Sequence, residues 1–467
     1  MKINITKAGI SFILSCGLAL VTGTFTSLSY GQGLVDAGNI RSYGAVGDGK
    51  ADDTKAIRSA IDSGTGVVYL PKGVFRITET IEVDLDKTGF ISVKGEGVAQ
   101  VIMAGPGPAF KFIGTHFKTA DPNTFSDNVW ERQRMPLVDG VAIVGAHPEA
   151  IGIEAVGTMQ MIITRINVRK VLHGIHLTGN NRNIIISDCN LFDNDGAGIY
   201  YDNVNFHQSN INGCHISSNK GGGIVTRGGA VRNIQITGCD IESNMDPAYP
   251  PAANIFIDCS ESSFGTAEVA ITGCTIQHRG TSPGSANIRI FGSSKPYSKF
   301  EKVNWGYVTI TGNILGDAEI NLHLKGCRGV AISNNTFWEG YKHNLLVEDC
   351  SNIAMGVNMF DENPPYIDNI VVSRNSLVVR NSEDCTFSGL HITNVRLDPA
   401  AFLIDNCNRM HITDCTILDC DNVALMLRNV SDSRVSGCLI RDNRLNSGSK
   451  PLEVVGGKGN MIDDIMK

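Results

Sequence analysis

Two adjacent carboxylates, Asp52 and Asp53, lie in the segment YGAVGDGKADDTKAIRSAID (43–62), and their type and spacing suit acid–base chemistry. Glycoside hydrolases use two carboxyl groups, one as an acid and the other as a base or nucleophile. The residues that follow favour a different role. The apolar residues between Ala56 and Ile61 share one face of a helix, and an Asp just before a helix is a preferred N-cap. We therefore predict that this pair belongs to a short capping helix and is not a catalytic pair.

A repeat of about 24 residues recurs from residue 160 onward and defines the elements that must position any site. Its copies include IISDCNL, NINGCHI, QITGCDI and AITGCTI, and later HITDCTI and RVSGCLI. One position of the repeat is occupied, in chain order, by Cys189, Cys214, Cys239, Cys274, Asn313, Asn335, Asn358, Leu390, Cys415 and Cys438. Sequence repeats of this length indicate a solenoid or a propeller.

A second strand pattern lies between these copies and reads GIHL, GIYY, GIVT, NIFI, NIRI, NLHL, NLLV, NIVV, AFLI and ALML. Apolar residues at alternate positions are typical of a strand with one buried face. No amphipathic run of helix length follows Asp62. We therefore predict an all-β fold, a single-stranded parallel β-helix in which equivalent residues of successive coils form ladders, and Asn can hydrogen-bond along such a ladder.

Cysteine is unusually frequent, and ten of its positions follow the repeat. Six occupy the position given above, and four more end the second strand pattern: Cys259, Cys327, Cys350 and Cys407. Stacked cysteines that point the same way have poor geometry for a disulfide. We predict buried free thiols, and because no CxxC or clustered Cys/His spacing is present we expect no metal site.

The N-terminus has the pattern of a secretory signal peptide. Lys2 and Lys7 precede an apolar run at 8–23, and small residues follow, so we predict a signal peptide at 1–31 and a secreted or periplasmic protein. The apolar run is short for a membrane span and no second run follows, so we expect no membrane span. The net charge of −7 disfavours a nucleic-acid partner. We predict one β-helix domain at 36–467 with a cap at about 39–64; the oligomeric state stays open.

The segments YGAVGDGKADDTKAIRSAID and GVVYLPKGVFRI together resemble the N-terminal signature of the pectate-lyase superfamily of right-handed parallel β-helix proteins, in particular its rhamnogalacturonase-like and epimerase-like members. The resemblance implies a right-handed solenoid that carries its substrate groove on the outer face of the GIHL-type strands. It also implies a polysaccharide as partner. The superfamily contains hydrolases, lyases, epimerases and binding proteins, so the reaction stays open.

Several motifs of the superfamily's enzymes are missing. The Asp-Asp and Arg-Ile-Lys motifs of polygalacturonases have no counterpart on these strands, and Arg165-Ile166-Asn167 lacks the Lys. A calcium-dependent lyase needs several acidic ligands on neighbouring coils, because calcium takes many oxygen ligands. No clear cluster of this kind appears, so we predict no cofactor, with calcium left as an alternative.

Alternation along the GIHL-type strands identifies the outward side chains: His176, Tyr200, Val225, Phe256, Arg289, His323, Leu346, Val371, Leu403 and Met426. As catalytic candidates we select Arg289, His323, His343 and Asp368. Histidine titrates near neutral pH and can act as acid or base, and arginine can stabilise developing negative charge. As substrate contacts we select Tyr200, Arg227, Lys325, Trp338 and Tyr341.

Insertions interrupt the repeat near these candidates, at 115–136, 245–254, 278–287, 293–307, 337–344 and 360–369, and loops on a rigid scaffold often carry function. We therefore predict a secreted enzyme that cleaves an acidic, pectin-like polysaccharide by β-elimination or hydrolysis. Hydrolysis would draw its two carboxylates from Asp195, Asp202, Asp349 and Asp368. The alternative is a non-catalytic carbohydrate-binding or surface β-helix.

Overall fold

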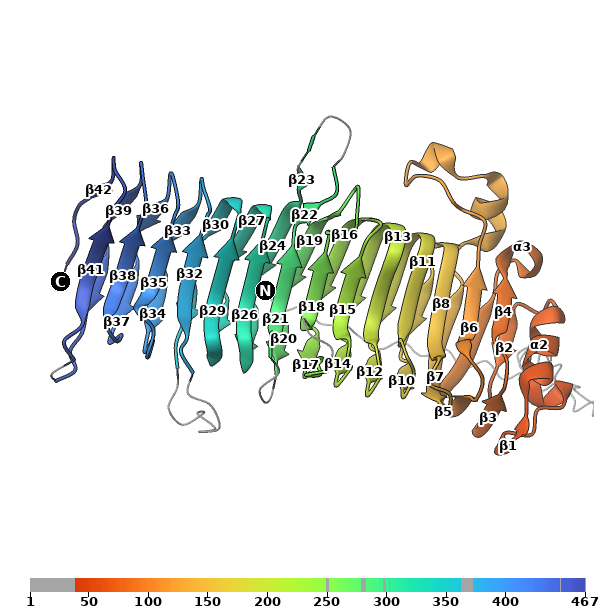
Figure 1. Cartoon of the computed structure of the whole chain (residues 1–467). Coiled ribbons are helices and arrows are strands. Elements are labelled where there is room, and N and C mark those ends of the chain that lie inside the picture. Colours follow the sequence, from red (N-terminus) through yellow and green to blue (C-terminus); the bar gives the residue numbers. More distant parts are fainter. Residues whose placement is uncertain are drawn as a thin grey trace, which may run out of the picture.

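The structure is a computed structural model that describes residues 38–248, 252–278, 283–296, 300–301, 303–362, 373–445 and 447–466. These residues form an elongated parallel solenoid with a helical cap at its N-terminal end (Figure 1). Forty strands are hydrogen-bonded in parallel, and their register divides each full coil among three faces, here called sheets A, B and C in the order in which the chain visits them. The predicted signal peptide at 1–31 lies outside the described residues.

Sheet A corresponds to the predicted GIHL-type strands. Its strands are β4 (Ile81–Asp84), β6 (Gly107–Ile113), β8 (Ala150–Met159), β11 (Ile175–Ser187), β13 (Ala197–Asn212), β15 (Gly222–Arg227), β18 (Ala253–Asp258), β21 (Ala286–Phe291), β26 (Ala318–Lys325), β29 (Gly340–Glu348), β32 (Ser376–Arg380), β35 (Ala400–Asp405), β38 (Val423–Arg428) and β41 (Lys450–Val455). The second halves of β11 and β13 turn the corner and continue into sheet B.

Sheet B carries the first part of the Cys-containing repeat. Its strands are β2 (Val67–Tyr69), β5 (Ser92–Met103), β7 (Leu137–Gly145), β9 (Ile162–Thr164), β16 (Ala230–Thr237), β19 (Thr266–Thr272), β24 (Gly306–Thr311), β27 (Arg328–Ser333), β30 (Ser351–Met355), β33 (Thr386–Ser388), β36 (His411–Thr413), β39 (Arg434–Ser436) and β42 (Met461–Ile462). The second halves of β5 and β7 continue into sheet C.

Sheet C follows the Cys position of each repeat. Its strands are β1 (Asp48–Asp52), β3 (Gly73–Ile77), β10 (Asn167–Arg169), β12 (Asn190–Phe192), β14 (His215–Ser217), β17 (Asp240–Glu242), β20 (Thr275–Gln277), β25 (Ile314–Gly316), β28 (Thr336–Phe337), β31 (Asn358–Phe360), β34 (Leu390–Thr393), β37 (Thr416–Leu418) and β40 (Leu439–Arg441). The all-β parallel solenoid predicted from the sequence is therefore confirmed, and each full coil contributes to three sheets.

Helices are short and lie at the N-terminal end or in one long connection. They are η1 (Ile40–Tyr43), α2 (Thr54–Asp62), α3 (Leu85–Thr88), η2 (Pro122–Thr124) and η3 (Val129–Gln133). No helix among the described residues is long and apolar enough to cross a membrane.

The Asp52–Asp53 pair holds this cap together. Asp53 occupies the N-cap position of α2, yet its carboxylate makes no capping hydrogen bond; it accepts instead from the backbone N–H groups of Val46 (2.7 Å) and Gly47 (3.1 Å). Asp52 accepts from the backbone N–H of Thr54 (3.1 Å) and from the Thr78 hydroxyl (2.6 Å). The structural interpretation of the pair agrees with these contacts, and Asp53 occupies the predicted N-cap position.

Buried ladders fill the solenoid behind the sheets. All twelve cysteines of the described residues are buried and free, as predicted. The predicted ladder of Asn313, Asn335 and Asn358 is present, with side-chain amides hydrogen-bonded from coil to coil at 3.0 and 2.9 Å. A longer asparagine ladder, which the sequence analysis missed, links sheet C to sheet A and consists of Asn194, Asn219, Asn244, Asn254, Asn287, Asn321, Asn344 and Asn375.

One coil differs from the sequence prediction. NIVV (369–372) was expected to form its sheet A strand, but β32 is formed by Ser376–Arg380, and Val378 lies between Leu346 and Leu403 in register. Both segments have alternating apolar residues, so the pattern alone does not separate them. In the structure, Asn375 occupies the ladder position that precedes β32.

Candidate functional site

A row of outward side chains crosses sheet A where β8, β11 and β13 lie side by side. Glu154, His176 and Tyr200 occupy equivalent positions of these strands, one coil apart. Asp202 is two residues after Tyr200, so it projects from the same face. His173 precedes β11 and adds a second imidazole. We call these five residues the His176 cluster.

Two carboxylates flank the ring of His176. Its Nδ1 lies 3.4 Å from Oε2 of Glu154, and its Nε2 lies 3.1 Å from Oδ2 of Asp202. Glu154 is largely buried and also pairs with Lys111 at 2.9 Å, whereas 41% of the Asp202 side chain is exposed. Nε2 is therefore the nitrogen on the more open side of the ring, and Glu154 holds the opposite nitrogen.

The same contacts set the charge of the cluster. Burial lowers the pKa of His176, but Glu154 and Asp202 outweigh burial, so the pKa of His176 is raised above its usual value. In turn, the contact with His176, reinforced by Lys111, lowers the pKa of Glu154. Burial, with Asp202 adding to it, raises the pKa of Tyr200 to about 12, so this phenol keeps its proton at neutral pH.

Aromatic stacking fixes the positions of the three rings. His176 and Tyr200 are stacked with their ring centroids 5.5 Å apart and their planes 8° apart, and His173 lies 4.8 Å from Tyr200. Nδ1 of His173 accepts a hydrogen bond from the backbone N–H of Ala197 at 3.0 Å. Burial, with His176 adding to it, lowers the pKa of His173 to about 4, so His173 is neutral and carries its proton on Nε2.

Two of the predicted catalytic residues, Arg289 and His323, form a second group further along sheet A. Nε of Arg289 donates to Nδ1 of His323 at 3.3 Å, and Nε2 of His323 donates to Oε2 of Glu348 at 2.8 Å. Nε of Arg380 donates to Oε1 of the same carboxylate at 2.7 Å. Burial lowers the pKa of His323, while the contact with His323, reinforced by Arg380, lowers the pKa of Glu348 to about 2.

The hydrogen-bonding groups of Arg289 and His323 in this second group are occupied by other protein atoms. Arg289 is 2% exposed and also donates to the carbonyl oxygen of Ala252 at 2.9 Å, so its guanidinium is committed to protein atoms. Both ring nitrogens of His323 have partners. The catalytic role assigned to these residues stays a prediction. His176 and His323 are about equally buried, and the two groups differ in the carboxylate that faces Nε2: the Asp202 side chain is 41% exposed, whereas the Glu348 side chain is 11% exposed.

The remaining predicted site residues are spread along the same sheet. His343 is at the start of β29 and its Nδ1 lies 2.7 Å from the Ser376 hydroxyl; burial lowers its pKa to about 4. Arg227 is exposed at the end of β15, beside Asp202 in register. Lys325 is exposed at the end of β26. Trp338 and Tyr341 are both partly buried at the corner between sheets C and A. Trp338 precedes β29, and Tyr341 lies at its start. Asp368 lies outside the described residues.

An apolar stretch separates the two polar groups. Val225 and Phe256 face outward from β15 and β18, yet both are buried, and Phe291 packs edge-on against Phe256 with centroids 5.5 Å apart. The guanidinium of Arg227 lies 5.4 Å from the centre of the Phe256 ring. Arg227 is thereby held next to the His176 cluster by a cation–π contact.

Insertions border sheet A on both edges. The connection that contains η2 and η3 and the hairpin of β22 (Ser293–Ser294) and β23 (Val303–Asn304) project from the edge where the strands of sheet A end (Figure 1). Four other insertions precede strands of sheet A, and their described residues therefore adjoin the opposite edge. They are the insertions at 245–254, 278–287, 337–344 and 360–369.

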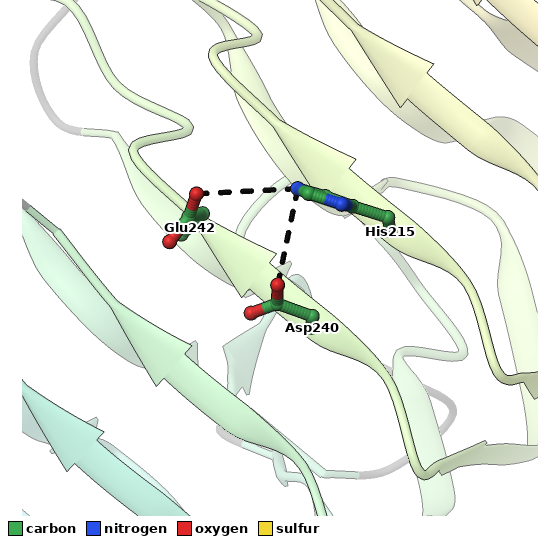
Figure 2. Close-up of side chains that lie close together, drawn as sticks. All are labelled: His215, Asp240 and Glu242. Atoms are coloured by element: carbon green, nitrogen blue, oxygen red, sulfur yellow. Dashed lines mark ion pairs between the residues drawn. The ribbon is translucent and has the colours of Figure 1, made fainter.

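A separate group of possible metal ligands lies on sheet C. Nε2 of His215 on β14 is 3.9 Å from both the Asp240 and the Glu242 carboxylates of β17 (Figure 2). All three side chains are well exposed to solvent. This group lies on a different face from the His176 cluster and takes no part in its geometry.

Sequence reasoning found part of the His176 cluster. Tyr200 and Arg227 were selected as substrate contacts, and His176 was placed on the outward face, but Glu154 was missed. A signal was present, because Gly152-Ile153-Glu154-Ala155 stands one repeat before Gly174-Ile175-His176-Leu177 with the same alternation.

Comparison with known proteins supports the fold. Residues 110–241 and 356–450, just under half of the chain, match the model of the right-handed β-helix region. This chain has a right-handed parallel β-helix fold. The tailspike protein gp49 from Pseudomonas phage LKA1 superposes with a TM-score of 0.52 over 91% of this chain and 84% of that chain, at 12% identity. At this level of identity the similarity concerns the fold.

Two curated relatives match shorter segments of this β-helix. Alginate lyase 7 of Azotobacter vinelandii is 52% identical over 44 residues, which is 9% of this chain and 5% of that protein. Mannuronan C5-epimerase AlgE3 of the same organism is 36% identical over 72 residues, 14% of this chain and 4% of that protein. The chain therefore spans only about a twentieth of the length of these relatives.

Proposed function

We propose that this protein is a secreted or periplasmic enzyme that cleaves an acidic polysaccharide by β-elimination at the His176 cluster. The observation that carries the proposal is the position of His176, held by Glu154 on one side and stacked on the protonated phenol of Tyr200 on the other. A base with a raised pKa beside a proton donor is what β-elimination requires.

In the proposed reaction, neutral His176 removes the proton on the carbon next to the uronate carboxylate. The electron pair of that C–H bond forms a C=C bond as the bond to the glycosidic oxygen breaks, and Tyr200 donates its proton to the departing oxygen. Nε2 becomes available when the exposed Asp202 side chain moves aside for substrate, while Glu154 stabilises the imidazolium that forms. Arg227 and Lys111 offset the charge of the substrate carboxylate.

Elimination is favoured over hydrolysis by the state of the carboxyl groups. Hydrolysis by two carboxyl groups needs one of them protonated, with a raised pKa. In this cluster the pKa of Glu154 is lowered, and the exposed Asp202 pairs with His176. His176 and Tyr200 project from the same face, so removal and donation of the proton occur on one side of the sugar.

The acidic substrate class is supported by local sequence similarity. The two Azotobacter proteins are named for alginate and mannuronan, which are polyuronides. The cations that border the cluster, Arg227 and Lys111, suit the same class of substrate.

The test is a screen of the purified protein against polyuronides and neutral polysaccharides, following the absorbance of unsaturated uronates and new reducing ends in parallel. We expect both signals with a polyuronide, and a loss of about 10² to 10⁴-fold in kcat for His176→Ala. Met426→Ala, which removes an outward side chain of the same row far from the cluster, is the control. Reducing ends without absorbance would overturn elimination in favour of hydrolysis.

A non-catalytic β-helix is the second candidate, and one observation favours it. Beyond the second polar group the outward row of sheet A becomes apolar, with Leu346, Val378, Leu403 and Met426 in register. Retardation in a polyuronide gel with neither cleavage signal would support this function. Deuterium exchange next to the carboxylate without cleavage would instead indicate epimerisation.

A further inference from the structure

The outer face of sheet B carries a groove of about 640 Å³ that the chemistry at His176 does not use. Its floor is built by β9, β11, β13 and β16, and its wall by the end of the connection at 115–136. The lining residues are Arg134, Met135, Gln160, Ile162, Asn183, Ile184, Ile185, Gln208, Asn210, Asn233 and Gln235. We call this the sheet B groove.

Carboxamides dominate the sheet B groove and form two rows. Gln160, Asn183, Gln208 and Asn233 lie at the corner between sheets A and B on successive coils, and the side-chain amide of Asn183 donates to that of Gln208. Asn210 and Gln235 follow in register on the strands themselves. The lining contains no carboxylate and a single cation, Arg134.

Backbone preference does not explain these amides. The corner residues have positive φ, which favours asparagine, but Gln160 (φ 54°) and Gln208 (φ 66°) hold the same position without that preference. Asparagine is also disfavoured within strands, yet Asn210 occupies one. Beyond the groove, the strand row continues as Ala270 and Thr309, so the run of amides ends where the groove ends.

Two polar atoms of the lining residues have no protein partner in the part of the chain that the structure describes. Oε1 of Gln160 and Nε of Arg134 are both buried and make no hydrogen bond among the described residues. Leaving such atoms unsatisfied costs about 1–3 kcal/mol each. Beside them, Ile185 and Met135 are 38% and 53% exposed, which gives the groove an apolar strip next to its amide rows.

We propose that the sheet B groove binds an uncharged saccharide chain, separately from the reaction at His176. A carboxamide both donates and accepts hydrogen bonds, as a sugar hydroxyl does, and the apolar strip suits the C–H face of a pyranose ring. The near absence of charge selects against a polyuronide. The four coils of the floor span roughly 14 Å at the spacing of parallel strands, which accommodates a short run of sugars.

The test is affinity electrophoresis of the full protein through gels that contain galactomannan, xyloglucan or mixed-linkage β-glucan, with polygalacturonate as the charged comparison. We expect retardation by at least one neutral glycan. The double variant Asn210→Ala/Gln235→Ala removes two amides and should weaken that binding about tenfold or more. Exposed positions on strand surfaces tolerate such changes, and circular dichroism verifies folding.

Two matched variants decide the location of binding. Thr309→Ala lies in the same outward row of sheet B outside the groove and should leave retardation unchanged. His176→Ala should also leave it unchanged, because the two sites lie on different sheets. The proposal is overturned if no neutral glycan retards the protein, if the double variant is retarded as strongly as the wild type, or if His176→Ala abolishes retardation.

Discussion

At the scale of single residues, the chemistry proposed for His176 depends on which charges face its two nitrogens. Lys111 pairs with Glu154, and the carboxylates of Glu154 and Asp202 flank the ring on its two sides. Burial alone would make His176 a weaker base, as it does for His173, whose pKa falls to about 4. The pKa values of two histidines three residues apart therefore shift in opposite directions, because only His176 lies within ion-pair distance of carboxylates.

Substitution Glu154→Gln should lower the pKa of His176, because it removes a negative charge that stabilises the imidazolium. The proposed base acts in its neutral form, so kcat/KM rises with pH through this pKa. We expect the rising limb of the profile to move to lower pH by about one unit. The measurement is the pH dependence of β-elimination on a polyuronide. The control is Asp258→Asn, because Asp258 lies beside Arg227 in register on β18. If the rising limb of the Glu154→Gln profile stays at the wild-type pH, the assignment of His176 as the base is contradicted.

At the scale of secondary-structure elements, the coils are held in register by ladders behind the sheets. In the longer asparagine ladder, each amide except the last, Asn375, donates both to the next amide and to a backbone carbonyl, as Asn321 does to Asn344 (2.6 Å) and Trp338 (2.8 Å). Every link is buried, so each asparagine satisfies groups that water does not reach.

Substitution Asn321→Leu should lower the free energy of unfolding by about 1–3 kcal/mol, because it leaves buried partners of the ladder without a hydrogen bond. Chemical denaturation measures the change. Asn190→Ala, which alters an exposed asparagine of β12, is the matched control and should change the stability by less than about 0.5 kcal/mol. Equal effects of the two substitutions would show that the ladder does not contribute specifically.

The burial of the cysteines leads to a separate prediction about their reactivity. All twelve cysteines of the described residues are buried, and burial raises the pKa of Cys259 and Cys420 to about 11. Thiolate is the reactive form, so Cys259 and Cys420 should be inert, and burial denies a reagent access to the other ten thiols. We expect almost no reaction with an aromatic disulfide reagent in buffer and reaction of these thiols in guanidinium chloride. Rapid reaction of several thiols in the native protein would contradict the burial of these cysteines.

At the scale of the whole molecule, the repeat makes much of the fold predictable from sequence. A period near 24 residues with alternating apolar positions leaves few alternatives to a solenoid, and the outward row of sheet A was correct except at Val371, whose place Val378 takes. The His176 cluster was harder to predict, because Glu154 and His176 meet only through register between coils. The long asparagine ladder was missed because four of its members precede strands of sheet A, whereas Asn254, Asn287, Asn321 and Asn344 lie within such strands.

The two ends of a solenoid expose strand edges that can pair with other molecules, so the N-terminal cap affects the whole molecule. Asp53→Ala removes the hydrogen bonds to the backbone of Val46 and Gly47 and leaves both N–H groups without their charged partner. We expect a loss of roughly 1–3 kcal/mol in stability and more aggregation on heating, measured by denaturation and light scattering. Asp62→Ala, at an exposed position of α2, is the control. Because the cap is distant from the His176 cluster, kcat per folded molecule should stay unchanged in Asp53→Ala; a loss of turnover in protein that remains folded would instead return the Asp52–Asp53 pair to the catalytic candidates.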